Sequence, residues 1–369
     1  KSPALTVLAI VLIAAMLYSL LPLSYLLREQ GQNRDNVAGF YAEPENTLDM
    51  VYIGASSCIT CWEPLKAFHD HGFTSYNFAH HTMTATTVKH YIIEALKTQS
   101  PEVFVVDLRP FQYADGINDE TGTANLHAEY AIRNGTDHLF YFNKNRNDLI
   151  RASVPAGERF SYYFDLFKYH RRWVFLPYQM AEGLRTGDYG FFDFADNVKK
   201  NPHKGFYTAT RTEKLAFTDY AAVTSKRPLQ GETDELFTEL LEFCKSEGLK
   251  VLFVVHHYPQ TKEDKELYNY MEERVRAYGL DFLNANDDWE TIGFDFDTDM
   301  YDSNHTNVLG AEKYTRYLAD YLVTQYDLPD HRTDAAYAEW DALYEAFAEE
   351  TADAKKELEN MMTKDPADN

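Results

Sequence analysis

The segment 51–58 constrains the fold of this chain more than any other. Its first three residues are apolar and typical of a short buried strand, and Gly54 begins a sharp turn that reaches Ser56. A serine at the carboxyl end of the first strand of an α/β sheet lies where open sheets bind ligands. A helix starting there would direct backbone N–H groups at a developing negative charge. The segment therefore predicts an α/β sheet with Ser56 at its edge, either as a reactive group or only as part of a turn.

A second polar segment, 299–307, precedes a long amphipathic run near the end of the chain. It contains Asp302 and His305, which are three positions apart and can face the same side of a turn that leads into a helix. A hydrolytic serine needs a base, and the base needs a group that orients it. The pair can supply both. The alternative is that Asp302 caps the final helix and His305 is a surface residue.

These two segments resemble the first and last blocks of the SGNH/GDSL hydrolases. Gly54-Ala55-Ser56 resembles the G-D-S block with Ala in place of Asp, and the segment 302–305 resembles the D-x-x-H block that precedes a helix. The resemblance covers roughly 48–108 and 232–325. It implies that Ser56 is the nucleophile, His305 the base and Asp302 the residue that orients the base.

Within that superfamily the chain is most similar to membrane-anchored bacterial proteins of cell-surface O-acylation. These include the D-alanyl-lipoteichoic-acid transfer protein and the accessory proteins of alginate acetylation. The similarity implies an acyltransferase that transfers acyl groups, acetyl above all, to a cell-surface glycan or polymer, with a membrane-bound O-acyltransferase as donor partner. A plain carbohydrate esterase is a second interpretation, and a catalytically silent glycan-binding or scaffold protein is a third.

The oxyanion hole of the family matches this chain less closely. The second block corresponds to Asn77-Phe78-Ala79, where Ala79 still carries a backbone N–H, and Asn77 is a further candidate. No G-x-N-D sequence occurs at 108–112, where the third block would fall. Arg109 could supply a charged donor there, or it could only pair with a carboxylate of the segment that follows.

The rest of the chain alternates between strand and helix patterns, which predicts a three-layer α/β fold with a parallel sheet and helices on both faces. The expected strands are 51–53, 75–78, 103–108, 250–255 and 281–283. The expected helices are 82–99, 233–248, 262–278 and 306–325. The strand 103–108 is a nearly continuous apolar run, as in central parallel strands.

The alternation stops between about 109 and 228, a long aromatic and polar segment. We expect an insertion that forms a lid over the carboxyl edge of the sheet and binds the acceptor. Its basic run 199–204 and the pair Arg171 and Arg172 are candidate contacts for an anionic glycan or donor group. The alternative for the arginine pair is a helix that is salt-bridged to the acidic surface.

The N-terminus predicts a membrane anchor. Ser2 to Leu27 contains no charged residue and is long enough to cross a bilayer as a helix. We expect a single-pass protein of the cell membrane with its catalytic domain outside, and a cleaved signal peptide is the alternative. The expected organisation is a transmembrane helix 1–27, a stalk 28–47, a catalytic domain 48–330, and an acidic C-terminal helix and tail 331–369. That helix packs on the domain or meets a partner.

Charge and cysteine content exclude several classes of protein. The net charge is −23, which makes nucleic acid an unsuitable partner. Three cysteines cannot form a disulfide framework. Cys58 and Cys61 are expected to be structural, either free or joined in a local disulfide, because zinc would need further ligands such as His80 and His81. We expect no metal and no cofactor.

Overall fold

The computed structural model describes residues 3–27, 31–114, 128–140, 143–164, 168–175, 177–178, 181 and 200–363 of the chain. Within these residues the core is a five-stranded sheet in the order β2-β1-β3-β4-β5, and every pair of neighbours is parallel. The strands are β1 (Met50–Ile53), β2 (Ser75–Asn77), β3 (Val103–Asp107), β4 (Val251–Val255) and β5 (Asp281–Asn284). The predicted α/β fold with a parallel sheet is confirmed.

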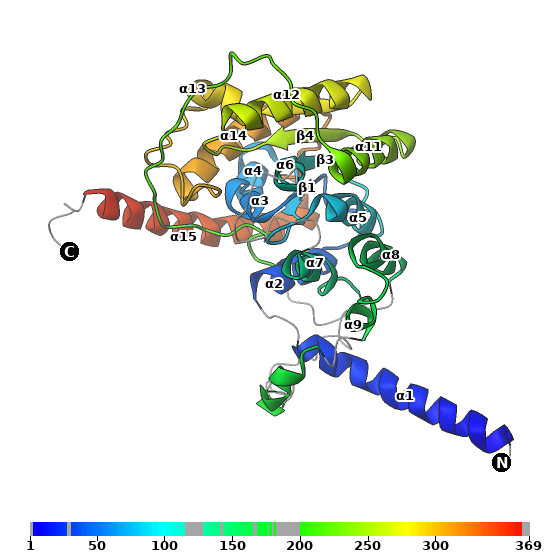
Figure 1. Ribbon diagram of the computed structural model, residues 1–369. Coiled ribbons are helices and arrows are strands. Elements are labelled where there is room, and N and C mark those ends of the chain that lie inside the picture. Colours follow the sequence, from blue (N-terminus) through cyan, green and yellow to red (C-terminus); the bar gives the residue numbers. More distant parts are fainter. Residues whose placement is uncertain are drawn as a thin grey trace.

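Helices lie on both faces of the sheet (Figure 1). Those before the fourth strand are α1 (Pro3–Leu27), α2 (Gln32–Tyr41), α3 (Ser56–Cys61), α4 (Pro64–His71), α5 (Ala85–Ala95), α6 (Arg109–Ala114), α7 (Glu129–Thr136), α8 (Lys144–Ser153), α9 (Phe160–Tyr163), the 3₁₀ helix η1 (His170–Phe175) and α11 (Gly231–Ser246). Those after it are α12 (Lys262–Ala277), η3 (Ala285–Asp288), α13 (Trp289–Ile292), α14 (Val308–Gln325), η4 (Ala335–Tyr337) and α15 (Ala338–Thr363).

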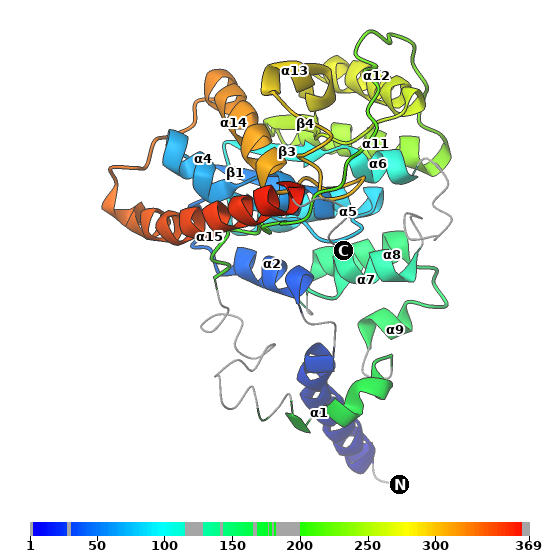
Figure 2. The same cartoon turned by 90° about the vertical axis from the view of Figure 1, so that its left-hand side faces the viewer.

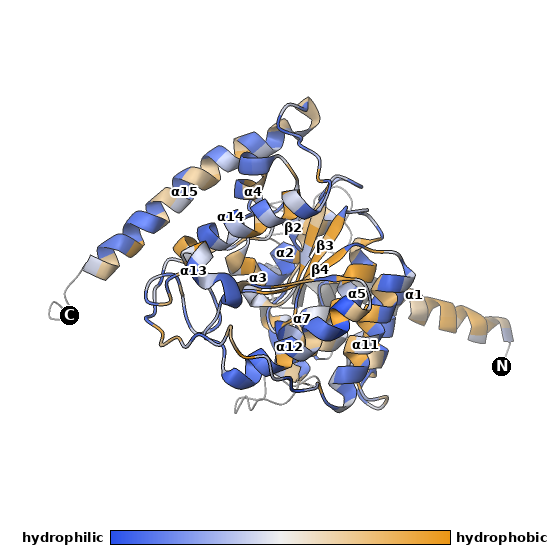
Figure 3. Cartoon of the chain, turned by 90° about the horizontal axis from the view of Figure 1, so that it is seen from above, coloured by the Kyte–Doolittle hydropathy of each residue, from blue (hydrophilic) through white to orange (hydrophobic). Residues whose placement is uncertain are grey.

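Alternating strand residues feed two separate cores. Val51 and Ile53 of β1 join one core with α5, α11 and α12, while Met50 and Tyr52 join the other with α3 and α14. Because both faces of β1, β3 and β4 are buried, their sequences are continuous apolar runs. Seen along the sheet, β3 and β4 are coloured as hydrophobic between helices with polar outer faces (Figure 3).

The segment expected to be a stalk is instead partly folded onto the domain. Residues 32–41 form α2, whose Val37 and Phe40 are fully buried in the core. The side-chain amide of Asn36 donates to the carbonyl oxygens of Asn77 at 2.8 Å and Ala79 at 2.7 Å. The polar composition of 28–47 does not reveal this contact, because Asn36 pairs with backbone that is far away in the sequence.

At the N-terminus, α1 extends away from the domain in two perpendicular views (Figures 1 and 2). Its described side chains are apolar and exposed, from Leu5 at 66% to Met16 at 56%. In the portion of the chain that the structure describes, no helix has the length and apolarity needed to cross a membrane.

The described residues of the expected insertion fall into two parts. Helices α6 to α9 and η1 form the first, and an extended segment, residues 200–228, forms the second; we call this second part the strap. The strap rises from beside α15 to α12 (Figure 1) and bonds to α3 through the amide of Tyr207, which donates to the carbonyl of Ile59. Residues 115–127 and 182–199, and so Lys199 of the basic run, lie outside the described residues.

The C-terminal helix α15 packs on the domain, which is one of the two interpretations that the sequence left open. Trp340 lies 5.1 Å from Phe68 between ring centroids, and Phe347 lies 5.7 Å from Phe206 of the strap. Beneath Trp340, the ammonium of Lys204 forms a buried ion pair with Glu43 at 2.8 Å. A buried charge needs such a partner, so this pair ties the strap to the segment after α2.

A buried glutamate makes the stability of the fold depend on pH. Burial raises the pKa of Glu63 to about 8, against an ordinary value of 4.5. The folded chain therefore binds a proton that the unfolded chain has released, and stability falls as pH rises from about 4.5 to 8, by at most about 1.4 kcal/mol per pH unit.

We predict that Glu63→Gln flattens this pH dependence and that its stabilising effect grows toward pH 8. The free energy of unfolding, measured with urea between pH 5 and 8, tests both expectations. Glu45→Gln, which changes an exposed glutamate, should leave the slope as it is. Equal slopes for Glu63→Gln and the unmodified chain would show that Glu63 stays ionised in the fold.

Candidate functional site

Ser56, His305 and Asp302 form one continuous chain of hydrogen bonds. The Oγ of Ser56 lies 2.8 Å from Nε2 of His305, whose Nδ1 lies 2.8 Å from Oδ1 of Asp302. Ser56 is the first residue of α3, and the other two lie in the loop before α14, which we call the base loop (residues 300–307). The structure thus brings together the three residues that the two sequence blocks singled out.

The hydrogen bonds determine which atoms of Asp302, His305 and Ser56 carry protons. Burial alone would raise the pKa of Asp302, but its contacts with His305 and with the backbone N–H groups of Asn304 and His305 outweigh that effect and lower it. An ionised carboxylate can only accept, so Nδ1 of His305 donates. Nε2 is then left as an acceptor for the Ser56 hydroxyl, which is the arrangement of a general base beside a nucleophile.

Only glycine fits at the turn before the serine. A Cβ on Gly54 would lie 2.0 Å from Sγ of Cys58 and 2.8 Å from Cβ of Asp107. The absence of a side chain lets β1 approach the end of β3 and turn directly into α3. This close approach explains the Gly of the Gly54-Ala55-Ser56 segment.

Asp107, at the end of β3, connects the surroundings of the nucleophile. Its carboxylate accepts from Oγ of Ser57 at 3.1 Å, from Nδ1 of His256 at 3.0 Å and from the backbone N–H of Arg109 at 3.0 Å. Burial would raise the pKa of Asp107, but His256, and then Arg109, outweigh that effect and lower it. Sequence reasoning missed this residue, although a lone carboxylate ending a buried apolar strand was the available signal.

Arg109 bonds to the base loop. Its guanidinium donates to Oδ1 of Asn304 at 2.6 Å, bonds the hydroxyl of Tyr113 and stacks on Tyr258 with 3.6 Å to the ring centroid. Asn304 lies between Asp302 and His305. Among the described residues, the hydrogen-bond partners of this guanidinium are the amide of Asn304 and the hydroxyl of Tyr113, and no carboxylate of the insertion pairs with it.

Asn77 and Ala79 are buried behind the site. The amide of Asn77 donates to the carbonyl of Trp62 at 2.8 Å, and the N–H of Ala79 donates to the carbonyl of Asn77 at 2.9 Å. Both donors are thus already in use. The amides of Ser56 and Ser57 are better placed, because the first N–H groups of a helix have no intrahelical acceptor.

His81 lies near His305 of the site. The sequence analysis considered His81 only as a metal ligand. Its Nε2 lies 2.9 Å from Oε1 of Gln32, and its backbone N–H donates to Oδ1 of Asn33 at 2.8 Å. Burial, and then the nearby His305, lower the pKa of His81. A neutral imidazole held by α2 therefore borders the base.

Arg171 and Arg172 are not near the triad. They belong to η1, which packs against α1, and in two perpendicular views α2 and α7 lie between them and α3 (Figures 1 and 2). The guanidinium of Arg172 lies 5.4 Å from the ring centroid of Tyr169. The structure therefore gives no support to an acceptor wall built from this pair.

The cysteines are buried thiols. Cys58, Cys61 and Cys244 are free, and burial raises the pKa of each, with the charge of Asp107 adding to the effect for Cys58 and Cys61. A raised pKa makes a thiol a poor nucleophile and a poor metal ligand. Among the described residues no group of His, Cys, Asp and Glu side chains could hold a metal ion.

The strap fixes the base loop from outside. The amide of Val308 donates to the carbonyl of Ala209 at 3.0 Å, and that of Glu213 donates to the carbonyl of Met300 at 2.9 Å. Met300 also pairs with Thr306 in an isolated antiparallel bridge. The loop that carries Asp302 and His305 is thus closed on itself and held at both ends.

We predict that cutting the link between Asn304 and Arg109 lowers the reactivity of Ser56. Asn304→Ala should slow covalent labelling by a fluorophosphonate by about 10- to 150-fold, since a hydrogen bond to a charged group contributes about 1.5–3 kcal/mol. Ser303→Ala is the matched control, because it removes only the 3.2 Å bond at the other end of the Asn304 amide. Equal labelling rates for the Asn304→Ala and unmodified proteins would rule the link out as a support of the base loop.

The chain was also compared with known proteins. A scan against models of protein families finds no match, and a search of curated proteins finds none either. The SGNH/GDSL resemblance therefore remains an expectation from two motifs. What the site can do follows from its geometry.

Proposed function

We propose that this protein is a serine-dependent acyltransferase or esterase that acts on acyl esters of a cell-surface glycan or polymer. The observation that carries the proposal is the unbroken chain from the Ser56 hydroxyl through His305 to the ionised Asp302. A catalytically silent scaffold would not need these three side chains in hydrogen-bonding order. The geometry thus favours an enzyme.

In this mechanism Oγ of Ser56 attacks the carbonyl carbon of the acyl ester while Nε2 of His305 takes the hydroxyl proton. Asp302 stabilises the imidazolium that forms. The negative oxygen of the tetrahedral intermediate is stabilised by the amides at the start of α3. His305 then returns the proton to the departing alkoxide, which leaves an acyl group on Ser56.

The acyl group then passes to a second oxygen nucleophile. A sugar hydroxyl gives transfer and water gives hydrolysis, and His305 removes the proton in both cases. The motif resemblance favours transfer of acetyl to a cell-surface glycan, with a membrane-bound O-acyltransferase supplying the donor. Product analysis with and without an acceptor glycan separates the two outcomes.

Ser56→Ala should abolish hydrolysis of a chromogenic acetyl ester, with a loss of at least about 1,000-fold in kcat while the fold persists. Ser57→Ala is the matched control. Its hydroxyl bonds to Asp107 and not to His305, so Ser57→Ala removes a support of the nucleophile but no reacting group, and the loss should be far smaller than for Ser56→Ala. Circular dichroism checks folding. A Ser56→Ala protein with near-normal activity would eliminate the mechanism.

We also propose that the uncharged segment from Ser2 to Leu27 anchors the protein in the cell membrane, with the catalytic domain outside. Protease treatment of intact cells should then remove the domain, and immunoblotting measures the loss. Protection of the domain, or a mature protein that begins after Leu27, would contradict the anchor.

A further inference from the structure

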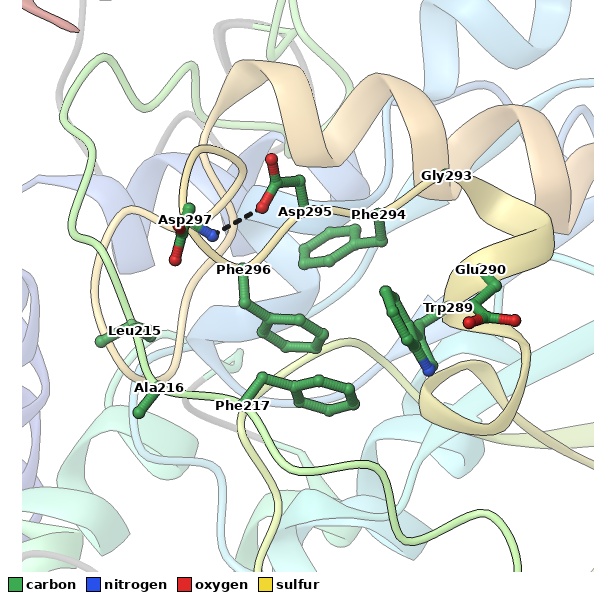
Figure 4. A pocket seen from close by; sticks show the side chains of 10 residues that line it. All are labelled: Leu215, Ala216, Phe217, Trp289, Glu290, Gly293, Phe294, Asp295, Phe296 and Asp297. Atoms are coloured by element: carbon green, nitrogen blue, oxygen red, sulfur yellow. Dashed lines mark hydrogen bonds between the residues drawn. The ribbon is translucent and has the colours of Figure 1, made fainter.

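A hollow with aromatic walls lies between the strap and the segment that leads into the base loop (Figure 4). Its volume is about 640 Å³. The strap contributes Leu215, Ala216 and Phe217, and the opposite side contributes Trp289, Glu290, Gly293, Phe294, Asp295, Phe296 and Asp297. None of these residues takes part in the mechanism above.

The rings of the hollow hold one another in place. Phe217 stacks on Phe296 with 3.9 Å between centroids and 5° between planes, and it meets Trp289 edge-on at 5.3 Å. Phe294 stacks on the buried ring of His257 at 3.9 Å. Phe294 and Phe296 are buried, whereas Phe217 and Trp289 are partly exposed. The hollow thus offers fixed apolar surface to a ligand.

Its rim is negatively charged. Glu290, Asp295 and Asp297 surround the rings (Figure 4), and Lys214 pairs with Asp297. In the described part of the chain, no ion pair involves Glu290 or Asp295. An anionic sugar would therefore be repelled, while a cationic group would be attracted.

We propose that this hollow binds a sugar ring that carries a free amino group. The apolar C–H face of such a ring packs on Trp289 and Phe217, and its ammonium group is attracted to the acidic rim, where Glu290 lies beside Trp289 (Figure 4). Sugar hydroxyls donate to the same carboxylates. The inference rests on the proposed function, for which it names the acceptor as a glycan that contains amino sugars.

The hollow is close enough to the triad for one glycan to reach both. The amide of Leu215 donates to the carbonyl of Phe296 at 3.0 Å, and two residues earlier the strap bonds to Met300. The amide of Tyr301, next to Met300, donates to the carbonyl of His305 at 2.8 Å. The backbone dimensions along this path limit the separation of Phe296 and His305 to about 20 Å.

The test measures binding to the Ser56→Ala protein, so that catalysis is not required. The probes are a glucosamine tetramer, its N-acetylated form and a hexuronate tetramer, each titrated near pH 6 while tryptophan fluorescence is recorded. We expect the glucosamine tetramer to bind most tightly and to weaken as salt is added. Trp289→Phe should remove the fluorescence change. Trp173→Phe, which alters the exposed tryptophan of η1, should keep it.

Charge is tested separately. Glu290→Gln should weaken binding of the glucosamine tetramer about tenfold, whereas Glu349→Gln on the exposed surface of α15 should not change it. The proposal is overturned if the hexuronate binds as tightly as the glucosamine tetramer, if no probe binds, or if Trp289→Phe keeps the signal. These outcomes leave the proposed chemistry untouched, because that chemistry stands or falls on ester hydrolysis by the protein with Ser56 intact.

Discussion

The site depends on one buried carboxylate, Asp107, at the carboxyl end of β3. It accepts hydrogen bonds from Ser57, next to the nucleophile, and from the amide of Arg109, whose guanidinium reaches Asn304 in the base loop. The nucleophile and the base come from opposite ends of the chain, and their 2.8 Å contact requires that both segments be positioned from a common point. A charge this deep is tolerated because His256 and the surrounding donors compensate for the loss of water.

The parallel sheet makes this arrangement available. Parallel strands all end at the same edge, so β1 delivers Ser56 and β3 delivers Asp107 to neighbouring positions. The base loop is not part of the sheet and needs its own supports. The strap supplies them through backbone bonds at Ala209 and Glu213. The insertion thus serves the site first by holding the base loop. The same strap also lines the aromatic hollow, with Phe217.

Sequence reasoning found the elements that have a local pattern. The strand patterns located the five strands of the sheet, and the spacing of Asp302 and His305, together with their order along the chain, the strand before Ser56 and the motif resemblance, predicted the three residues as one site. It failed where a side chain is used by a distant partner. Ala79 has its amide occupied within its own turn, Arg109 bonds to Asn304, and α2 is fixed by Asn36. None of these contacts has a period or a fixed spacing, so composition and motif alone could not reveal them.

The central claim is that Ser56 carries the acyl group during turnover. The most direct measurement is peptide mapping by mass spectrometry after the enzyme is mixed with an acetyl ester and quenched rapidly in acid, which traps an ester intermediate. The account predicts acetylation of the peptide that contains Ser56, at Ser56 itself, and none when His305 is replaced by alanine. Acetylation at another residue, or turnover with no acetylated peptide at any quench time, would contradict it.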